Sequence, residues 1–206
     1  MNYSHCGVLK NRLSLALALA ALLTGCARTT PIQYYQLAAM GEDHAPVEFA
    51  APEAITIGLG PILIPEYLAR PQIVSRTSAN RLTIADRHRW AEPLAANLAR
   101  VLSEDLAALL GTDRIVSHPW SRGREVDCQI KIEVLRFEGE PNDTVNLVAR
   151  WQVIGQEGQV LLPERRSSFN LPATTSDQEA MVAALSRGVA SFAREIAAAL
   201  PPLLMP

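Results

Sequence analysis

Apolar and polar side chains alternate along several stretches of the chain, and this alternation predicts β-strands. The clearest stretch is residues 126–137, in which every second side chain from Val126 to Val134 is apolar. Residues 145–154 and about 159–170 follow, separated by turn-forming residues, so we expect these three strands to pair consecutively and antiparallel. Shorter strands are expected earlier, at 31–37, 55–60, 72–76, 81–85 and 114–117, with 72–85 forming a hairpin.

Two stretches with apolar residues at helical spacing predict two long helices. The first runs from Glu92 to Leu110, and the second from Asp177 to about Leu200 with Ser176 as its N-cap. Each helix has one apolar face, and most strands alternate and so form a sheet with one apolar face. Both helices can bury their apolar faces against that face of the sheet. The expected fold is α+β: a single domain with a mainly antiparallel twisted sheet and the two long helices packed on one face.

The first 26 residues have the pattern of a bacterial lipoprotein leader. Lys10 and Arg12 precede an apolar run, Leu13–Leu23, whose length as a helix would be only ~16 Å, against about 30 Å for a bilayer core. The run ends in Leu-Thr-Gly-Cys, a lipobox in which Cys26 receives diacylglycerol and an N-acyl chain. The alternatives are an ordinary cleaved signal with a chance cysteine, or an N-terminal anchor helix.

This leader predicts the domain organisation and the location. We expect a signal peptide at 1–25, a lipidated N-terminus with the first strand and a connector at 26–53, and the α+β domain at 54–206. Ala27 follows the cysteine, which favours the inner leaflet of the outer membrane, with the protein facing the periplasm. Without the leader the chain has 17 basic and 21 acidic residues, a net charge of −4, which argues against nucleic acid as a partner.

Residues with catalytic or metal-binding chemistry do not form a recognisable pattern. There is no G-x-S-x-G motif, and the histidines of the mature chain lack metal-ligand spacing (His44, His88 and His118). Cys128 lies on the apolar side of its strand and is interpreted as a small buried hydrophobic residue. Glu104 and Asp105 are interpreted as part of a solvated helix face. We therefore expect no enzyme activity, no metal and no cofactor beyond the lipid on Cys26.

Several segments together resemble a known family, the ABC-type transport auxiliary lipoproteins. They are Gly58–Arg76, Asn80-Arg-Leu-Thr83 followed by Arg89–Leu94, and the strand Tyr34-Tyr-Gln-Leu37, and the likeness runs from Cys26 to about Leu200. The resemblance implies a non-catalytic accessory of an intermembrane phospholipid transport system that maintains envelope integrity. It also implies a homo-oligomeric ring and a partner of the mammalian-cell-entry (MCE) type, from an ABC or Pqi-like transporter. The alternative is a structural or regulatory ring-forming envelope lipoprotein, associated with secretion or the cell wall.

The segment Pro65–Gln72 is the predicted partner or subunit interface. Two prolines fix φ at Pro65 and Pro71, so the segment is stiff and loses little entropy on binding. Side chains typical of interfaces lie within and near it: Tyr67, Leu68, Arg70, Gln72 and, if the following hairpin folds back, Trp90. The alternative is that Tyr67 and Leu68 cap the edge of the sheet and that Arg70 pairs with a local acid.

Overall fold

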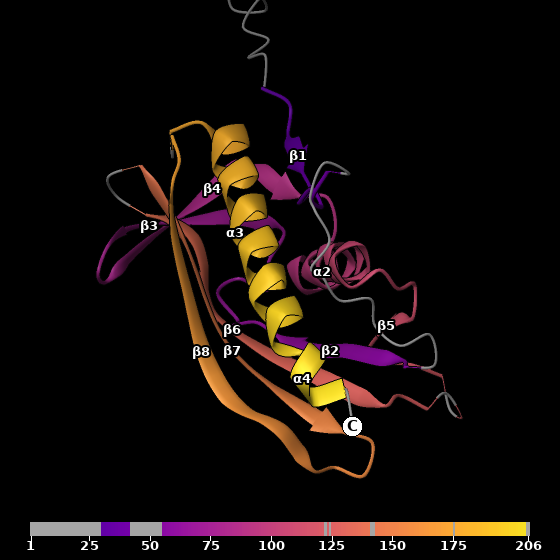
Figure 1. Ribbon diagram of the computed structural model, residues 1–206. Coiled ribbons are helices and arrows are strands. Elements are labelled where there is room, and N and C mark those ends of the chain that lie inside the picture. The colour runs from indigo at the N-terminus through magenta and orange to yellow at the C-terminus, as the bar shows by residue number, and fades with distance from the viewer. Residues whose placement is uncertain are drawn as a thin grey trace, which may run out of the picture. The chain divides into compact units, whose positions relative to one another are not determined.

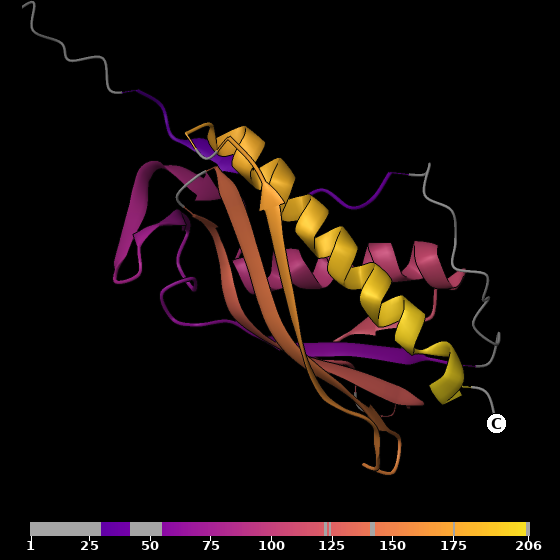
Figure 2. The same ribbon diagram turned by 60° about the vertical axis from the view of Figure 1, so that its left-hand side comes forward.

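The computed structural model describes residues 30–41, 55–121, 123, 125–140, 143–174 and 176–204. The lipobox with Cys26, the residues 42–54 and His44 lie outside this described part. From Ile32 onward the chain forms one compact unit, in which a twisted eight-stranded sheet carries both long helices on one side (Figure 1, Figure 2). The prediction of a single α+β domain is confirmed.

Three long antiparallel strands dominate the sheet, as the alternation predicted. They are β6 (Cys128–Glu140), β7 (Thr144–Gly155) and β8 (Val160–Pro172), and β7 pairs with β6 on one edge and β8 on the other. The hairpin of β3 (Gln72–Ser78) and β4 (Arg81–Trp90) is also antiparallel and also expected. These pairings follow from short turns, since two strands joined by a few residues can only run in opposite directions.

The other half of the sheet contains parallel pairs, which the alternation of side chains does not indicate. β2 (Ile57–Leu63) pairs parallel with β6 and with β5 (Ile115–Ser117), and β1 (Gln33–Tyr35) pairs parallel with β4. The second edge of β6 is thereby shared, because β2 pairs with its first half and β3 meets it at Gly139. The sheet is therefore mixed, whereas a mainly antiparallel sheet was expected.

A bulge in β6 changes which side chains face the helices. Even-numbered side chains from Cys128 to Val134 are buried, but the register with β7 shifts between Val134 and Arg136, and Phe137 becomes the next inward residue. Glu138 consequently lies on the opposite side from Phe137, and yet none of its side chain is exposed. Something must cover this carboxylate, and the β2–β3 connection does so, as described below.

The helices begin and end close to the expected positions. α2 (Leu94–Leu110) starts after Pro93 and ends at Gly111, which has the left-handed φ of 59° that glycine accommodates. α3 (Gln178–Ala199) is capped by the carboxylate of Asp177, not by Ser176 as expected, since Asp177 accepts from the N–H groups of Glu179 and Ala180. After α3 ends, Pro201–Leu204 forms a short helix, α4.

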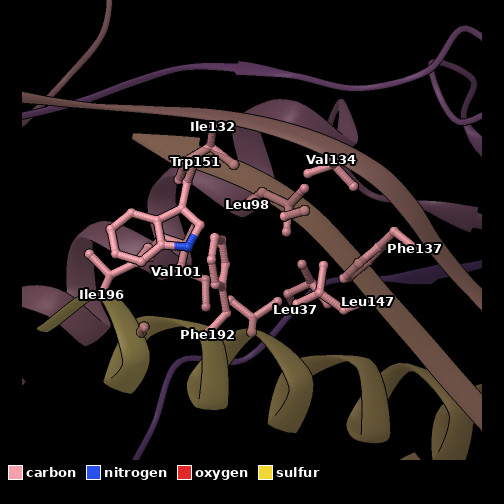
Figure 3. Close-up of a cluster of buried hydrophobic side chains, with 14 of the residues drawn as sticks. Leu37, Leu98, Val101, Ile132, Val134, Phe137, Leu147, Trp151, Phe192 and Ile196 are labelled. Atoms are coloured by element: carbon pink, nitrogen blue, oxygen red, sulfur yellow. The ribbon is translucent and has the colours of Figure 1, made fainter. Parts of the chain in front are cut away.

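The long helices pack their apolar faces onto different parts of the sheet and onto each other: α2 lies against β2 and β5, and α3 against β7 and β8. The T-shaped contact of Trp151 with Phe192, with ring centroids 6.2 Å apart, joins β7 to α3 (Figure 3). The Trp151 indole N–H donates to Ser167 over 2.9 Å, and the Ser167 hydroxyl donates to Glu195 over 2.6 Å, so the polar atoms around this contact have partners. A single continuous core results, to which Leu37 from the N-terminal stretch also belongs.

Residues 36–41 run across the two helices as an extended strap without strand pairing. Polar side chains of the helices replace the missing strand: Asn97 accepts from the N–H of Leu37, Ser186 from Ala38 and Asp105 from Met40. Asp105 is only 1% exposed. The interpretation of Asp105 as part of a solvated face is therefore wrong, because its carboxylate serves the backbone of the strap.

Candidate functional site

A pocket of about 440 Å³ lies between the β2–β3 connection and the beginning of α2. The connection, seen as the loop between β2 and β3 in Figure 2, contains the predicted interface segment Pro65–Gln72. The lining is mainly apolar and consists of Ile64, Ala69, Arg70, Pro71, Trp90, Ala91, Glu92, Pro93, Leu94 and Ala95. The structure thus brings two of the predicted site residues, Arg70 and Trp90, to one concave surface.

Trp90 and Leu68 are core residues. Trp90 is 5% exposed and its ring packs 6.3 Å from that of Phe137, while Leu68 is 2% exposed. The backbone N–H of Trp90 donates to the Pro71 carbonyl over 2.7 Å, which closes the hairpin over the segment. A partner can therefore reach Trp90 only through the pocket, and Leu68 not at all without rearrangement of the fold.

Tyr67 has a structural role that corresponds to the alternative in the sequence analysis. Its hydroxyl donates to Glu138 Oε2 over 2.6 Å, and Arg76 donates to Glu138 Oε1 from Nε and Nη2, each over 2.8 Å. The N–H of Phe137 also donates to this carboxylate. We call Tyr67, Arg76 and Glu138 the carboxylate clamp. Burial and the hydrogen bond to Glu138 raise the pKa of Tyr67 well above its ordinary value.

The clamp explains why the segment is fixed in place, since it ties the β2–β3 connection and β3 to β6 through one buried charge. Sequence reasoning did not find Glu138 or Arg76. The available signal was the break in alternation near Arg136, which marks the bulge that turns Glu138 away from the helices. Nothing in the sequence indicates that Tyr67 is the residue that meets it.

Arg70 and Gln72 are half-buried and lie at the two ends of the same turn as the exposed Pro71. Gln72 is opposite Arg89 in the β3–β4 ladder. Arg70 Nε is buried, and no acceptor for it exists among the described residues. The local ion pair that the sequence analysis gave as an alternative for Arg70 is not found there. Arg70 is thus a predicted site residue whose Nε–H has no partner in the described part of the chain.

Glu92, the one acidic residue of the pocket lining, already has partners. Its Oε1 accepts from Arg100 Nε over 3.2 Å and from Gln36 Nε2 over 3.1 Å. Arg100 also donates to the carbonyl of Leu37, so Glu92 is part of the polar border of the strap. Its charge is therefore compensated outside the pocket.

The remaining candidate groups have structural surroundings. Burial raises the pKa of the Cys128 thiol to about 12, so it is protonated and unreactive at neutral pH. His88 shares a 2.8 Å hydrogen bond with the Tyr35 hydroxyl, and His118 packs edge-on against Trp120. Within the described part of the chain no cluster of His, Cys, Asp and Glu is suited to hold a metal, and no described helix is long and apolar enough to cross a membrane.

A second, larger groove of about 580 Å³ lies between the N-terminal stretch and the first turns of α3. Its lining mixes polar side chains such as Gln33 and Glu179 with Tyr34 and Val182. It contains none of the predicted interface residues. The pocket beside Pro65–Gln72 is therefore the candidate that joins the sequence prediction to a concave apolar surface.

Comparison with known proteins gives a consistent result. A family model described as the ABC-type transport auxiliary lipoprotein component matches residues 35–197. The chain is also 27% identical over 141 residues to the intermembrane transport lipoprotein PqiC of Escherichia coli (strain K12), covering 66% of this chain and 71% of that protein.

Two solved structures share the fold at low sequence identity. A crystal structure of an uncharacterized protein superimposes with a TM-score of 0.67 at 24% identity, over 82% of this chain and 98% of the other. Protein XCC0632 from Xanthomonas campestris superimposes with a TM-score of 0.65 at 16% identity, over 83% of this chain and 96% of the other. At these identities the likeness concerns the fold alone.

Proposed function

This chain belongs to the family of ABC-type transport auxiliary lipoprotein components, and we propose that it is the non-catalytic accessory of an MCE/ABC-type system that moves phospholipid between membranes. The observation that carries the proposal is the family match. It runs from the last residue of β1 through the rest of the sheet and includes α2 and nearly all of α3. The name of the similar PqiC protein, an intermembrane transport lipoprotein, supports the same kind of role.

We propose that Cys26 carries the lipid and that the protein is held at the inner leaflet of the outer membrane, facing the periplasm. The lipobox and Ala27 support this proposal. Two or more acyl chains are needed for stable anchoring, because a single chain binds only marginally. Replacing Cys26 with Ala should give an unlipidated protein that is absent from the outer-membrane fraction. Normal acylation and sorting of that variant would refute the anchor.

The exposed part of Pro65–Gln72 is proposed to contact the MCE-type partner or a neighbouring subunit of a ring. Its stiffness supports this, since the carboxylate clamp and two prolines hold the segment before binding. The best probe is Glu66, which is exposed and does not line the pocket. Glu66→Arg should weaken partner or subunit association without lowering the melting temperature, whereas Arg81→Glu, an equal charge reversal on the β3–β4 hairpin, should not.

Affinity purification from detergent-solubilised envelopes tests the function directly. We expect an MCE-type protein with its permease and ATPase to co-purify with the tagged full-length lipoprotein. Light scattering of the purified protein should show a mass well above that of a monomer. Recovery of secretion or cell-wall proteins without any transporter component would instead support a structural or regulatory envelope lipoprotein.

A further inference from the structure

The pocket beside α2 has walls suited to a hydrocarbon chain. Ile64, Trp90 and Leu94 supply large apolar surfaces, and two prolines, Pro71 and Pro93, stiffen the rim. Its volume of about 440 Å³ is within the range of pockets that enclose small ligands, roughly 300–1,000 Å³. Binding of an apolar ligand in such a solvent-filled pocket is favourable, because it removes the apolar surfaces of both the pocket and the ligand from water.

The pocket lining also contains one cationic side chain, that of Arg70. Arg70 Nε–H is buried with no acceptor in the described part of the chain, and an unmade hydrogen bond of a buried charged group is unfavourable. Leu94 and Ala95 begin α2, whose N-terminus has no side-chain cap, so their N–H groups add positive potential at the same lining. Glu92 does not supply the missing anion, because it is engaged by Arg100 and Gln36.

The backbone around the pocket argues against a peptide as the occupant. A buried peptide brings a polar amide with each residue, and every amide needs a hydrogen-bonding partner. Pro71 and Pro93 have no N–H, and the N–H groups of Trp90 and Ala91 already donate to Pro71 and Tyr35. The lining can thus satisfy one anionic group but not a series of amides.

We propose that this pocket binds an anionic amphiphile, a molecule with one carboxylate or phosphate head on a single acyl chain. The guanidinium of Arg70, which is half-buried and lines the pocket, binds the head, and Trp90, Ile64 and Leu94 contact the chain. The auxiliary lipoprotein is then itself a lipid-binding protein. This inference does not depend on the partner contact proposed above, since the Glu66→Arg test concerns a residue outside the pocket.

Fluorescence quenching can test the proposal on residues 27–206, because the core lies entirely within the compact unit Ile32–Pro206. The probe is ω-bromoundecanoate below its micellar concentration, since bromine quenches tryptophan on contact and Trp90 lines the pocket. We expect saturable quenching that is lost in Trp90→Phe. Dodecyl phosphate should compete with the probe, because the proposed site accepts a phosphate head as well as a carboxylate. The cationic dodecyltrimethylammonium should not compete.

Two variants distinguish the contribution of the ligand's anionic head to binding from that of its acyl chain. Arg70→Gln should weaken binding about ten- to a hundredfold, the effect of losing a charge-assisted hydrogen bond. Ala95→Phe should fill the pocket and abolish binding with the charge intact. Arg81→Gln, which removes an exposed arginine away from the pocket, is the matched control and should bind normally. Equal affinity for neutral bromoundecanol, competition by the cationic surfactant, or binding unchanged in Arg70→Gln and Ala95→Phe would overturn the proposal.

Discussion

The carboxylate clamp gives the most quantitative test of the fold around the site. Tyr67→Phe removes only the hydroxyl, which donates over 2.6 Å to a carboxylate with no exposed surface. Glu138 keeps Arg76 and the N–H of Phe137, so the charge stays paired but loses one strong donor. Hydrogen bonds to charged groups contribute about 1.5–3 kcal/mol, and we expect a loss of that size.

Thermal and urea unfolding, followed by tryptophan fluorescence, measure this loss. For a domain of this size each kcal/mol shifts the melting temperature by roughly 2–4 °C, so Tyr67→Phe should melt about 3–12 °C below the wild type. Tyr34→Phe makes the same chemical change on a side chain that is 63% exposed, and it should stay within about 0.5 kcal/mol of the wild type.

A double-mutant cycle decides whether the hydroxyl acts through Glu138. Glu138→Gln leaves the Arg76 guanidinium without its carboxylate and should cost about 3–5 kcal/mol, as for other broken buried ion pairs. Tyr67→Phe should then add less than it does alone, because its acceptor has lost its charge. Strict additivity of the two losses, or equal melting of Tyr67→Phe and Tyr34→Phe, would refute this account of the clamp.

Three further predictions concern the core and two titratable groups. Phe192→Ala should cost about 3–5 kcal/mol in urea unfolding, since a 2% exposed ring that contacts Trp151 leaves a cavity. Cys128, with its pKa raised to about 12, should react with Ellman's reagent at pH 8 only after unfolding, and rapid reaction of the native protein would contradict its burial. Because the folded-state pKa of Tyr67 is raised above the ordinary value of 10.0, its stabilisation is complete below about pH 10 and is lost at higher pH, so the urea midpoint should fall there in the wild type and less in Tyr67→Phe.

The strands and helices follow from the sequence because burial imposes its period on the side chains, but strand direction does not. An alternating strand has the same pattern in either orientation, so nothing in Ile57–Leu63 indicates that it runs parallel to a strand about 70 residues later. Antiparallel neighbours were predictable only where short turns joined them, as between β7 and β8. Parallel pairing is decided by the whole packing arrangement, in which α2 connects β4 to β5.

The location of the candidate site was predictable from residue types and from the expected hairpin. Tyrosine, arginine and fixed prolines made Pro65–Gln72 conspicuous, and the hairpin does bring Trp90 back to it. The roles of the individual side chains were not predictable, since they depend on contacts between distant segments. The Tyr67 hydroxyl donates to Glu138 of β6, while the buried Nε–H of Arg70 has no acceptor among the described residues, although both side chains are of types common at interfaces.

Some polar residues lie within the apolar faces of the helices, where the helical pattern of apolar positions does not explain them. Asn97, Asp105 and Ser186 are all buried, and each accepts from a backbone N–H of the strap. A buried polar side chain requires a partner, so such residues indicate that another segment crosses the helix there. For a chain tethered a few residues upstream, as proposed for Cys26, this crossing has a mechanical consequence. A pull on the anchor first loads β1 in its ladder with β4 and then the strap, whose Leu37 belongs to the core.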